Sequence, residues 1–379
     1  MRCIKWNGVV LAGLLSFGVH AHPYVDFYGV EPQIGNLLVK KYAKQIALIA
    51  NSFLDFASKN AVGNNAERDV ENLSQMKSKL ELEMQQSGDF AYLNLDMIFY
   101  ENPKLAYTTI EVVTKDDTDR MHYLYDSAKN NIHKPQAEPA HDVIMQMELF
   151  SAEVLRLFIL GELQDIPDDQ LVCPVYHCLA SFDQPTLAPY LSLFNAAAIY
   201  DKALIIDTLK NDPVLSRRAA AVFLVGHFRD PVEIIQVLLP YVNDSSIEVR
   251  NNALRVLSST LRISKINSID PRAFLDLLNS PLDTDRNKSL FVLLAIAGGE
   301  TAKNWLGMHG EKLLLANLAL TQPNNHRIAY KILQKISGQS FGDRAMDDWH
   351  NWFVNHAQPT TITHRVWQFL LHQYRQLHI

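Results

Sequence analysis

The 379-residue sequence predicts a mainly α protein, an α-solenoid of helix pairs preceded by a small α+β domain with two helices and a three-strand antiparallel meander. Three observations predict this class. Apolar residues recur three or four positions apart before residue 88 and again after residue 139, which is the spacing of a helix face. Between residues 90 and 125 the period changes to two, as in strands. A repeat of about 32 residues then appears in the second half, and repeats of this length indicate stacked helix pairs.

The amino-terminal 21 residues have the three parts of a secretory signal peptide. Arg2 and Lys5 precede an 11-residue apolar run, and small residues lead up to a cleavage position after Ala21. The run is shorter than the roughly 20 apolar residues that a membrane span requires. We therefore expect residues 1–21 to be removed, the mature chain to be periplasmic or secreted, and no integral membrane segment to remain.

The composition is that of a globular protein, with 48% hydrophobic and 20% charged residues. Without the leader, 33 Lys and Arg residues stand against 41 Asp and Glu residues, so the formal net charge moves from −6 to −8. Sequence-independent binding of DNA or RNA needs clustered Lys and Arg side chains. The sequence has no such cluster, and we expect no nucleic-acid partner.

Residues 22–135 are predicted to form the α+β domain, with amphipathic helices over 37–58 and 68–88. The stretch "FAYLNLDMIFY", which starts at Phe90, alternates apolar and polar side chains, as a half-buried strand does. The stretches "LAYTTIEVV" and "RMHYLY" follow it after turns and supply a second and a third strand. Two helices on one face of this meander would complete the domain.

Residues 136–180 are predicted to be connecting helices that contain a disulfide. Cys173 and Cys178 are the two cysteines that remain without the leader, and an exported protein meets an oxidising environment. Free buried thiols, a metal site and a redox pair are the alternatives, but only His177 lies nearby as a further ligand, and the spacing exceeds that of a thioredoxin-like pair. Pro174 suits a first helical turn, so we expect a helix to begin directly after Cys173.

An internal repeat begins at Asp212. The stretches "DPVLSRRAAAVFLV" and "DSSIEVRNNALRVL" align at an offset of 32 residues, which pairs Asp212 with Asp244 and Arg218 with Arg250. Looser copies follow in "DTDRNKSLFVLL" and "NNHRIAYKIL". Equivalent positions of stacked repeats lie in line. We predict a structural ladder in which each aspartate accepts hydrogen bonds from a repeat turn or from an arginine of the neighbouring repeat.

The pattern of Asp, Val-Arg, Ala and Leu in "DSSIEVRNNALRVL" resembles a HEAT repeat, particularly the short bacterial type related to the phycobilin-lyase group. The ending "SGQSFGDRAMDDWHNWF" is similar to a closing segment of bacterial HEAT-repeat proteins. The resemblance covers roughly residues 180–356 and implies that residues 181–379 form a HEAT-like helical repeat domain. It brings no catalytic residue with it.

Other candidate sites have simpler explanations. The carboxylates of Asp165, Asp168 and Asp169 suit calcium chemically but lack the ordered spacing and glycine of a calcium loop, so we expect a solvated turn. His22 would begin the mature chain and could bind copper together with His122, but we expect a frayed terminus. The sequence contains no nucleophile elbow, phosphate loop or paired-histidine zinc motif. No catalytic residue, metal ion or cofactor is predicted.

The expected function is binding of a protein or peptide partner, because solenoids present long faces made by the second helix of each pair. These helices, "PVEIIQVLLPYV" and "PRAFLDLLN", carry Glu233, Gln236 and Asp276 against a lone Arg272. We expect a neutral to acidic face that suits an apolar or mildly basic partner. The alternative is an enzyme or cofactor-processing protein with a site between the α+β domain and the helices, since some HEAT-type relatives handle tetrapyrroles.

Overall fold

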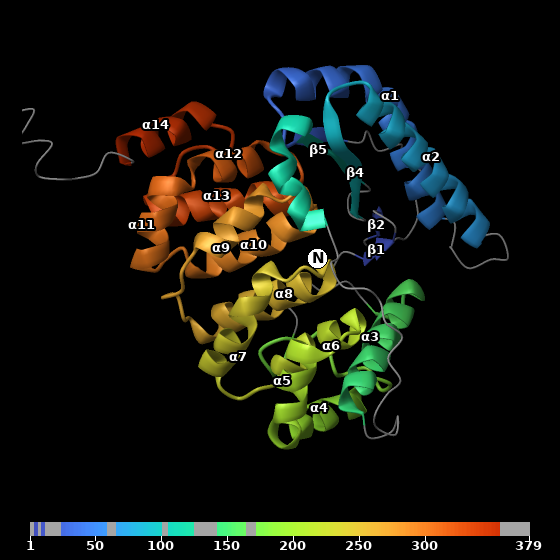
Figure 1. Ribbon diagram of the computed structural model, residues 1–379, viewed down its shortest axis with the longest axis vertical. Helices are drawn as coiled ribbons and strands as arrows, with labels where there is room; N and C mark the ends of the chain where they lie inside the picture. The colour runs from blue at the N-terminus through green and yellow to red at the C-terminus, as the bar shows by residue number, and fades with distance from the viewer. Residues whose placement is uncertain are drawn as a thin grey trace, which may run out of the picture.

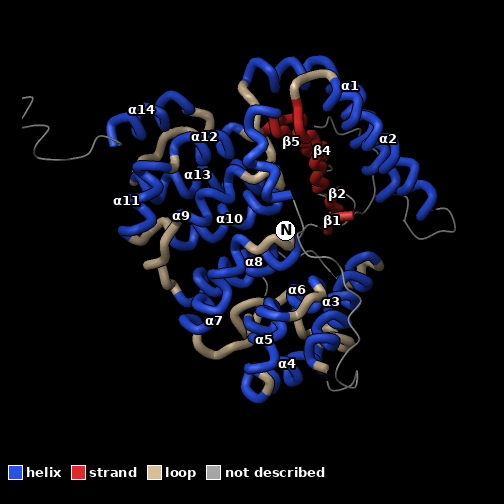
Figure 2. Tube along the Cα trace, viewed as in Figure 1, coloured by secondary structure: helices blue, strands red, loops and turns tan. Residues whose placement is uncertain are grey.

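The computed structural model describes the backbone of residues 4–6 and 9–11, together with residues 24–58, 66–100, 105–124, 142–163 and 172–356. Among these residues the strands all lie in the amino-terminal third of the chain, and the rest is helical (Figure 2). The predicted mainly helical fold with a small sheet is therefore confirmed. Its arrangement as a solenoid of HEAT-like pairs stays a prediction.

The sheet has the strand order β1-β2-β4-β5-β3. Its strands are β1 (Ile4–Trp6), β2 (Val9–Leu11), β3 (Tyr24–Tyr28), β4 (Phe90–Tyr100) and β5 (Leu105–Thr114). β4 and β5 form the predicted antiparallel hairpin, in which Asn94 lies opposite Glu111 and Asp96 opposite Thr109. β3 and β2 add in parallel on the two outer sides, next to β5 and β4 respectively.

The prediction of a third strand at "RMHYLY" is wrong. Residues up to 124 of this stretch belong to the 3₁₀ helix η1 (Lys115–Leu124), because closely spaced aspartates favour a turn over an extended chain. The edge of β5 is occupied instead by β3, whose sequence "YVDFY" also alternates. The helix brings Arg120 to the sheet, where its Nη1 donates to the carbonyl oxygen of Val112 at 2.9 Å.

The helices α1 (Pro32–Ser58) and α2 (Ala66–Gln86) cover one face of the sheet (Figure 1). Their predicted apolar stripes pack on the alternate β4 residues Leu93, Leu95, Met97 and Phe99. The expected half-buried strand is wrong, because Asp96, Ile98 and Tyr100 of the opposite β4 face are buried as well. Tyr28 and Glu111 of the sheet contact the carboxyl-terminal part, through the carbonyl oxygen of Leu278 and the side chain of Arg286.

Five of the later helices contact one another in chain order. This row, which we call the inner layer, consists of α3 (Val143–Ile159), α6 (Leu215–Val225), α8 (Ile247–Ser264), α10 (Asp283–Ile296) and α13 (Pro323–Ser337), each in contact with the next. The remaining helices are α4 (Ala188–Tyr200), α5 (Lys202–Asn211), α7 (Pro231–Leu238), η3 (Leu239–Asn243), α9 (Arg272–Asp276), η4 (Leu277–Asn279), α11 (Glu300–His309), α12 (Glu311–Ala319) and α14 (Met346–His356). One continuous apolar core runs through this array from Val143 to Phe353.

No helix in the described ranges is both long enough and apolar enough to cross a bilayer. The predicted leader overlaps β1 and β2, whereas the expected cleavage position after Ala21 lies outside the described residues. The same holds for His22 and for the acidic group at Asp165, Asp168 and Asp169. His122 is described and lies exposed on η1, where its ring contacts that of Tyr123.

Candidate functional site

The predicted disulfide is confirmed. Cys173 and Cys178 are bonded, and their Cα atoms lie 5.7 Å apart. A regular helix would separate residues five apart by about 8.6 Å, so the chain must bend between them. Residues 172–187 do bend, without forming the helix that we expected directly after Cys173. Pro174 lies in this bend rather than in a first helical turn.

The disulfide loop is held against the inner helix layer. The N–H of Tyr176 donates to the carbonyl oxygen of Gly226 at 3.2 Å. The buried ring of His177 stacks on Phe223, with 5.5 Å between the ring centroids, and its Nδ1 lies 3.2 Å from the Ser259 hydroxyl. A Cβ atom at Gly226 would lie 3.2 Å from the Cβ of His177, so glycine permits this close approach.

A cavity of about 800 Å³ opens between this loop and the array. Its walls are the disulfide loop, the end of α4, the turn between α6 and α7, and the end of α8. We call it the arginine groove and define it by Tyr176, Ile199, Tyr200, Arg229, Arg262 and Ile263. None of these residues was singled out from the sequence, because they come from four segments that are far apart in the chain.

The rim of the arginine groove is apolar and exposed. Tyr200 keeps 83% of its surface accessible, Ile199 46% and Ile263 43%. Scattered exposed apolar side chains are ordinary, but a group of them beside a cavity is typical of an interaction site. This rim therefore offers contact area for an apolar side chain of a partner.

The charge of the groove differs from the neutral to acidic charge expected for the face of the second helices, which lies elsewhere and stays a prediction. Arg229 and Arg262 line the cavity, and no Asp or Glu is among its described lining residues. Burial lowers the pKa of His227 at the floor to about 4, so this ring is neutral near pH 7. Its Nδ1 lies 3.0 Å from the Oδ1 of Asn195, a distance that fits a hydrogen bond donated by the neutral ring. The charge in the groove comes from the two arginines.

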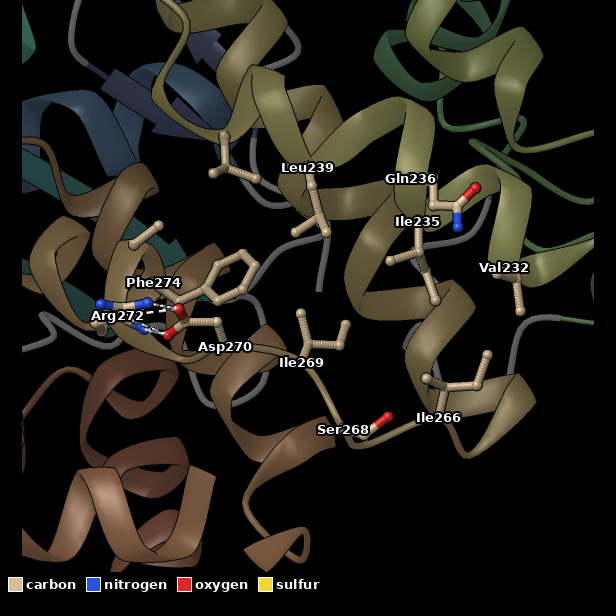
Figure 3. A pocket seen from close by; sticks show the side chains of 12 residues that line it. Val232, Ile235, Gln236, Leu239, Ile266, Ser268, Ile269, Asp270, Arg272 and Phe274 are labelled. Carbon is tan, nitrogen blue, oxygen red and sulfur yellow. Dashed lines mark hydrogen bonds and ion pairs between the residues drawn. The ribbon is translucent and has the colours of Figure 1, made fainter. Parts of the chain in front are cut away.

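A second cavity, of about 540 Å³, lies among α7, η3, the segment that follows α8, and α9 (Figure 3). It shares no lining residue with the arginine groove. Its walls are mainly apolar, with Ile235, Leu239 and Phe274 among them. The polar pair at its rim, Asp270 and Arg272, is joined by an ion pair.

The ladder residues lie where the chain turns into α6 and α8. Asp212 accepts from the N–H of Val214 at 2.9 Å, and Asp244 accepts from the N–H of Ser246 at 2.9 Å. Arg218 donates to the carboxylate of Asp244 in the next turn. Arg218 and Asp244 therefore lie together, and the carboxylates of Asp212 and Asp244 each accept a hydrogen bond from the backbone of their own repeat turn.

Arg250 finds a carboxylate that the sequence analysis missed. It donates to the Asp244 carbonyl oxygen at 2.7 Å and, through Nε and Nη2, to Asp285 at 3.1 and 2.8 Å. In the next copy the position of Asp244 is taken by Ser280, which has no carboxylate, so Asp285 supplies it. The sequence did offer one signal for this pair, because "DTDR" places the carboxylate of Asp285 directly beside the next repeat arginine, Arg286.

Arg286, the following arginine, reaches across to the sheet. Its Nη1 donates to Glu111 at 2.8 Å and to the Ser280 carbonyl oxygen at 2.8 Å, and its Nη2 also contacts Glu111. The guanidinium carbon lies 4.0 Å from the centre of the Tyr28 ring. The side chains of Arg286 and Glu111 are both fully buried. The carboxylate that binds Arg286, the last arginine of the ladder, therefore comes from the α+β domain and not from a neighbouring repeat.

Two further acids complete a buried charge cluster, which we define as Asp96, Glu111, Asp283 and Arg286. Carboxylate oxygens of the three acids lie within 4.8 Å of one another. Burial, with help from Asp96 and Asp283, raises the pKa of Glu111 to about 7 even though Arg286 lowers it. Carboxylates are suitable ligands for a hard cation, but here Arg286 already binds Glu111, and Asn325 donates to Asp283.

Comparison of the chain with protein families, curated proteins and solved structures gave no match.

Proposed function

We propose that this chain is an exported interaction protein that binds a protein or peptide partner on a HEAT-like helical array. The arginine groove carries the proposal, because it combines an exposed apolar rim with a concave cavity that two arginines line. The ordered contacts of α3, α6, α8, α10 and α13 support a stacked array. The disulfide supports an oxidising compartment.

One observation favours the enzyme alternative, namely the raised pKa of Glu111 between the α+β domain and the helices. The geometry of the buried charge cluster favours a structural role instead. Glu111 and Arg286 are fully buried and bind each other, and Arg286 also packs on Tyr28. A substrate would have to break this pair in order to reach either group, whereas the arginine groove is open.

The proposal is tested with the intact mature chain in its native compartment. A photo-crosslinking amino acid replaces Tyr200 in the groove or, as a matched control, Leu48 on α1, which is 60% exposed. We expect one partner protein to be crosslinked from position 200, not from position 48, and to be lost when Ile263→Asp is added. Absence of groove-dependent crosslinks, together with conversion of a small molecule by the same chain, would establish the enzyme alternative.

A further inference from the structure

One edge of the sheet is formed by residues that the sequence assigns to the leader. The strand order β1-β2-β4-β5-β3 places β1 and β2 beside β4. Both strands lie within residues 1–21, so removal of the predicted leader takes them away and leaves β4 as the outer strand. An outer strand presents backbone N–H and C=O groups to which a strand of another chain can bind.

A contact from α2 shows which backbone groups of β4 face this edge. The N–H of Leu95 donates to Oε1 of Glu81 at 2.8 Å, so the backbone of Leu95 points away from β5. The pairing with β5 is regular over residues 92–100, and successive residues of a strand point their backbone groups to alternate sides. The N–H and C=O groups of Met97 and Phe99 therefore face the same edge as those of Leu95.

The strand β2 lies on this edge just beyond Leu95 (Figure 1). It runs parallel to β4, with Val9 opposite Met97 and Val10 opposite Ile98, and its sequence "VVL" is apolar. The side chains of Met97 and Phe99 are fully buried beside it. The edge thus has the shape to pair with a short apolar strand in the parallel direction, and loss of β2 opens that position.

The opposite edge of the sheet is fastened to the helical array. Asp26 on β3 accepts hydrogen bonds from the N–H and the hydroxyl of Thr321, both at 2.6 Å. The hydroxyl of Tyr28 donates to the carbonyl oxygen of Leu278, also at 2.6 Å. Removal of the leader leaves these contacts in place, so it is the β4 edge that maturation opens.

We propose that the β4 edge of the mature chain binds an extended apolar segment of a partner protein, which adds parallel to β4 beside residues 97–99. In strand addition, backbone hydrogen bonds supply affinity and the side chains of the added strand supply specificity. The parallel direction favours a partner over a second copy, because two β4 edges related by a two-fold axis perpendicular to the sheet would run antiparallel. The inference rests on the export part of the proposed function, since only removal of the leader opens the edge.

The probe for this edge is a synthetic, fluorescently labelled peptide of residues 7–14, "NGVVLAGL". We expect it to bind the mature chain, residues 22–379, and to slow amide hydrogen exchange in residues 95–100. A matched peptide with N-methylated Val9 and Val10 keeps every side chain but lacks two backbone donors, and it should bind about tenfold more weakly. The full chain that keeps its leader should bind neither peptide, because β2 already lies on the edge.

The direction of the bound peptide is read from a photo-crosslinker at its amino end. Parallel addition places this end beside residues before Met97, whereas antiparallel addition places it beside residues after Ile98. Crosslinks after Ile98 would overturn the inference. So would absence of binding, equal binding of the two peptides, or equal binding by the chain that keeps its leader.

Two further outcomes separate the edge from the rest of the proposal. Dimers of the mature chain that protect residues 95–100 and dissociate on addition of the peptide would assign the edge to a second copy and overturn the inference. Native protein that still begins at Met1 would overturn both the inference and export. Crosslinks from Tyr200 in the arginine groove do not depend on the β4 edge, so the proposed partner binding would stand or fall separately.

Discussion

The arginines of the buried charge cluster and of the arginine groove are the same residue type in opposite surroundings. Arg286 is fully buried, contacts both oxygens of Glu111 and packs on Tyr28. Arg229 and Arg262 are exposed and line a cavity whose described lining residues include no carboxylate. Desolvation makes a buried charge depend on its partner, whereas water replaces a lost partner at the surface. The first arginine should therefore act in folding and the other two in binding.

Breaking the buried pair has the largest expected effect. Arg286→Met would leave Glu111 without its partner in a dry interface, and loss of one partner of a buried ion pair costs about 3 to 5 kcal/mol. Urea denaturation measures the change in unfolding free energy. The control is E111L/R286M, which removes both charges and should lose much less, because an apolar pair of similar size needs no partner. A loss below about 1 kcal/mol for the single variant would show that the pair does not hold the interface.

The pH dependence of stability sharpens the comparison. The folded-state pKa of Glu111 is raised to about 7 from 4.5, so the folded chain keeps a proton that the unfolded chain loses. Its contribution is present below pH 4.5 and is lost as the pH rises to about 7. The folded-state pKa of His227 is lowered to about 4 from 6.5, so its contribution is present above pH 6.5 and is lost as the pH falls to about 4.

The two contributions oppose each other between pH 4.5 and 6.5. Unfolding free energies across this range should therefore rise more steeply with pH in Glu111→Gln than in the wild type, because only the His227 contribution remains. His227→Gln should show the reverse difference. Identical pH profiles for wild type and both variants would contradict the assignment of these two groups.

The sequence predicted those parts of the fold that depend on neighbouring residues and missed those that depend on contacts between distant segments. The hairpin of β4 and β5 was predictable because alternation is local. The third strand was placed on the wrong segment because the alternation of "RMHYLY" matched a strand, while the aspartates just before it, in "KDDTD", favoured a helical turn. The strand that does pair with β5, Tyr24–Tyr28, comes from the far side of two helices, and no local pattern reports such pairing.

The candidate sites also divide into those set by local sequence and those set by long-range contacts. Cys173 and Cys178 were predictable from their number and compartment, and Asp212 and Asp244 from the repeat. The role of Glu111 could not be predicted, because this residue lies on a strand 175 residues before Arg286 in the chain. The groove was missed for the same reason, and with it the positive charge brought by Arg229 and Arg262 from outside the two predicted second helices.

In the ladder, the loss of unfolding free energy on removing an arginine should increase with the burial of its ion pair. Arg250 binds fully buried Asp285, whereas Arg218 and Asp244 both keep some exposure. We expect Arg250→Ala to cost about 2 to 3 kcal/mol of unfolding free energy and Arg218→Ala about 1 kcal/mol. Lys210→Ala, at an exposed position of α5, is the control and should change little. Equal melting temperatures for the Arg250 and Lys210 variants would exclude a structural ladder.

The disulfide belongs to the groove and should affect both stability and binding. Closing so short a loop stabilises by about 2 kcal/mol in the chain-entropy model. We expect C173S/C178S to lose about this much and to crosslink the partner from position 200 more weakly, because the loop forms one wall of the groove. Alkylation of the wild type after denaturation without reductant should find no free thiol. Two free thiols there would contradict the bond.

The smallest effect on stability is expected from the arginines of the groove, and it provides the sharpest comparison with Arg286. Arg229→Gln and Arg262→Gln remove exposed charges, so the unfolding free energy should stay within about 0.5 kcal/mol of the wild type. Crosslinking of the partner from position 200 should nevertheless fall. Urea denaturation and photo-crosslinking of the same variants measure both quantities. A loss of more than about 1 kcal/mol on removal of either arginine would mean that the residue holds the fold, as Arg286 does, and the division of labour between the two regions would fail.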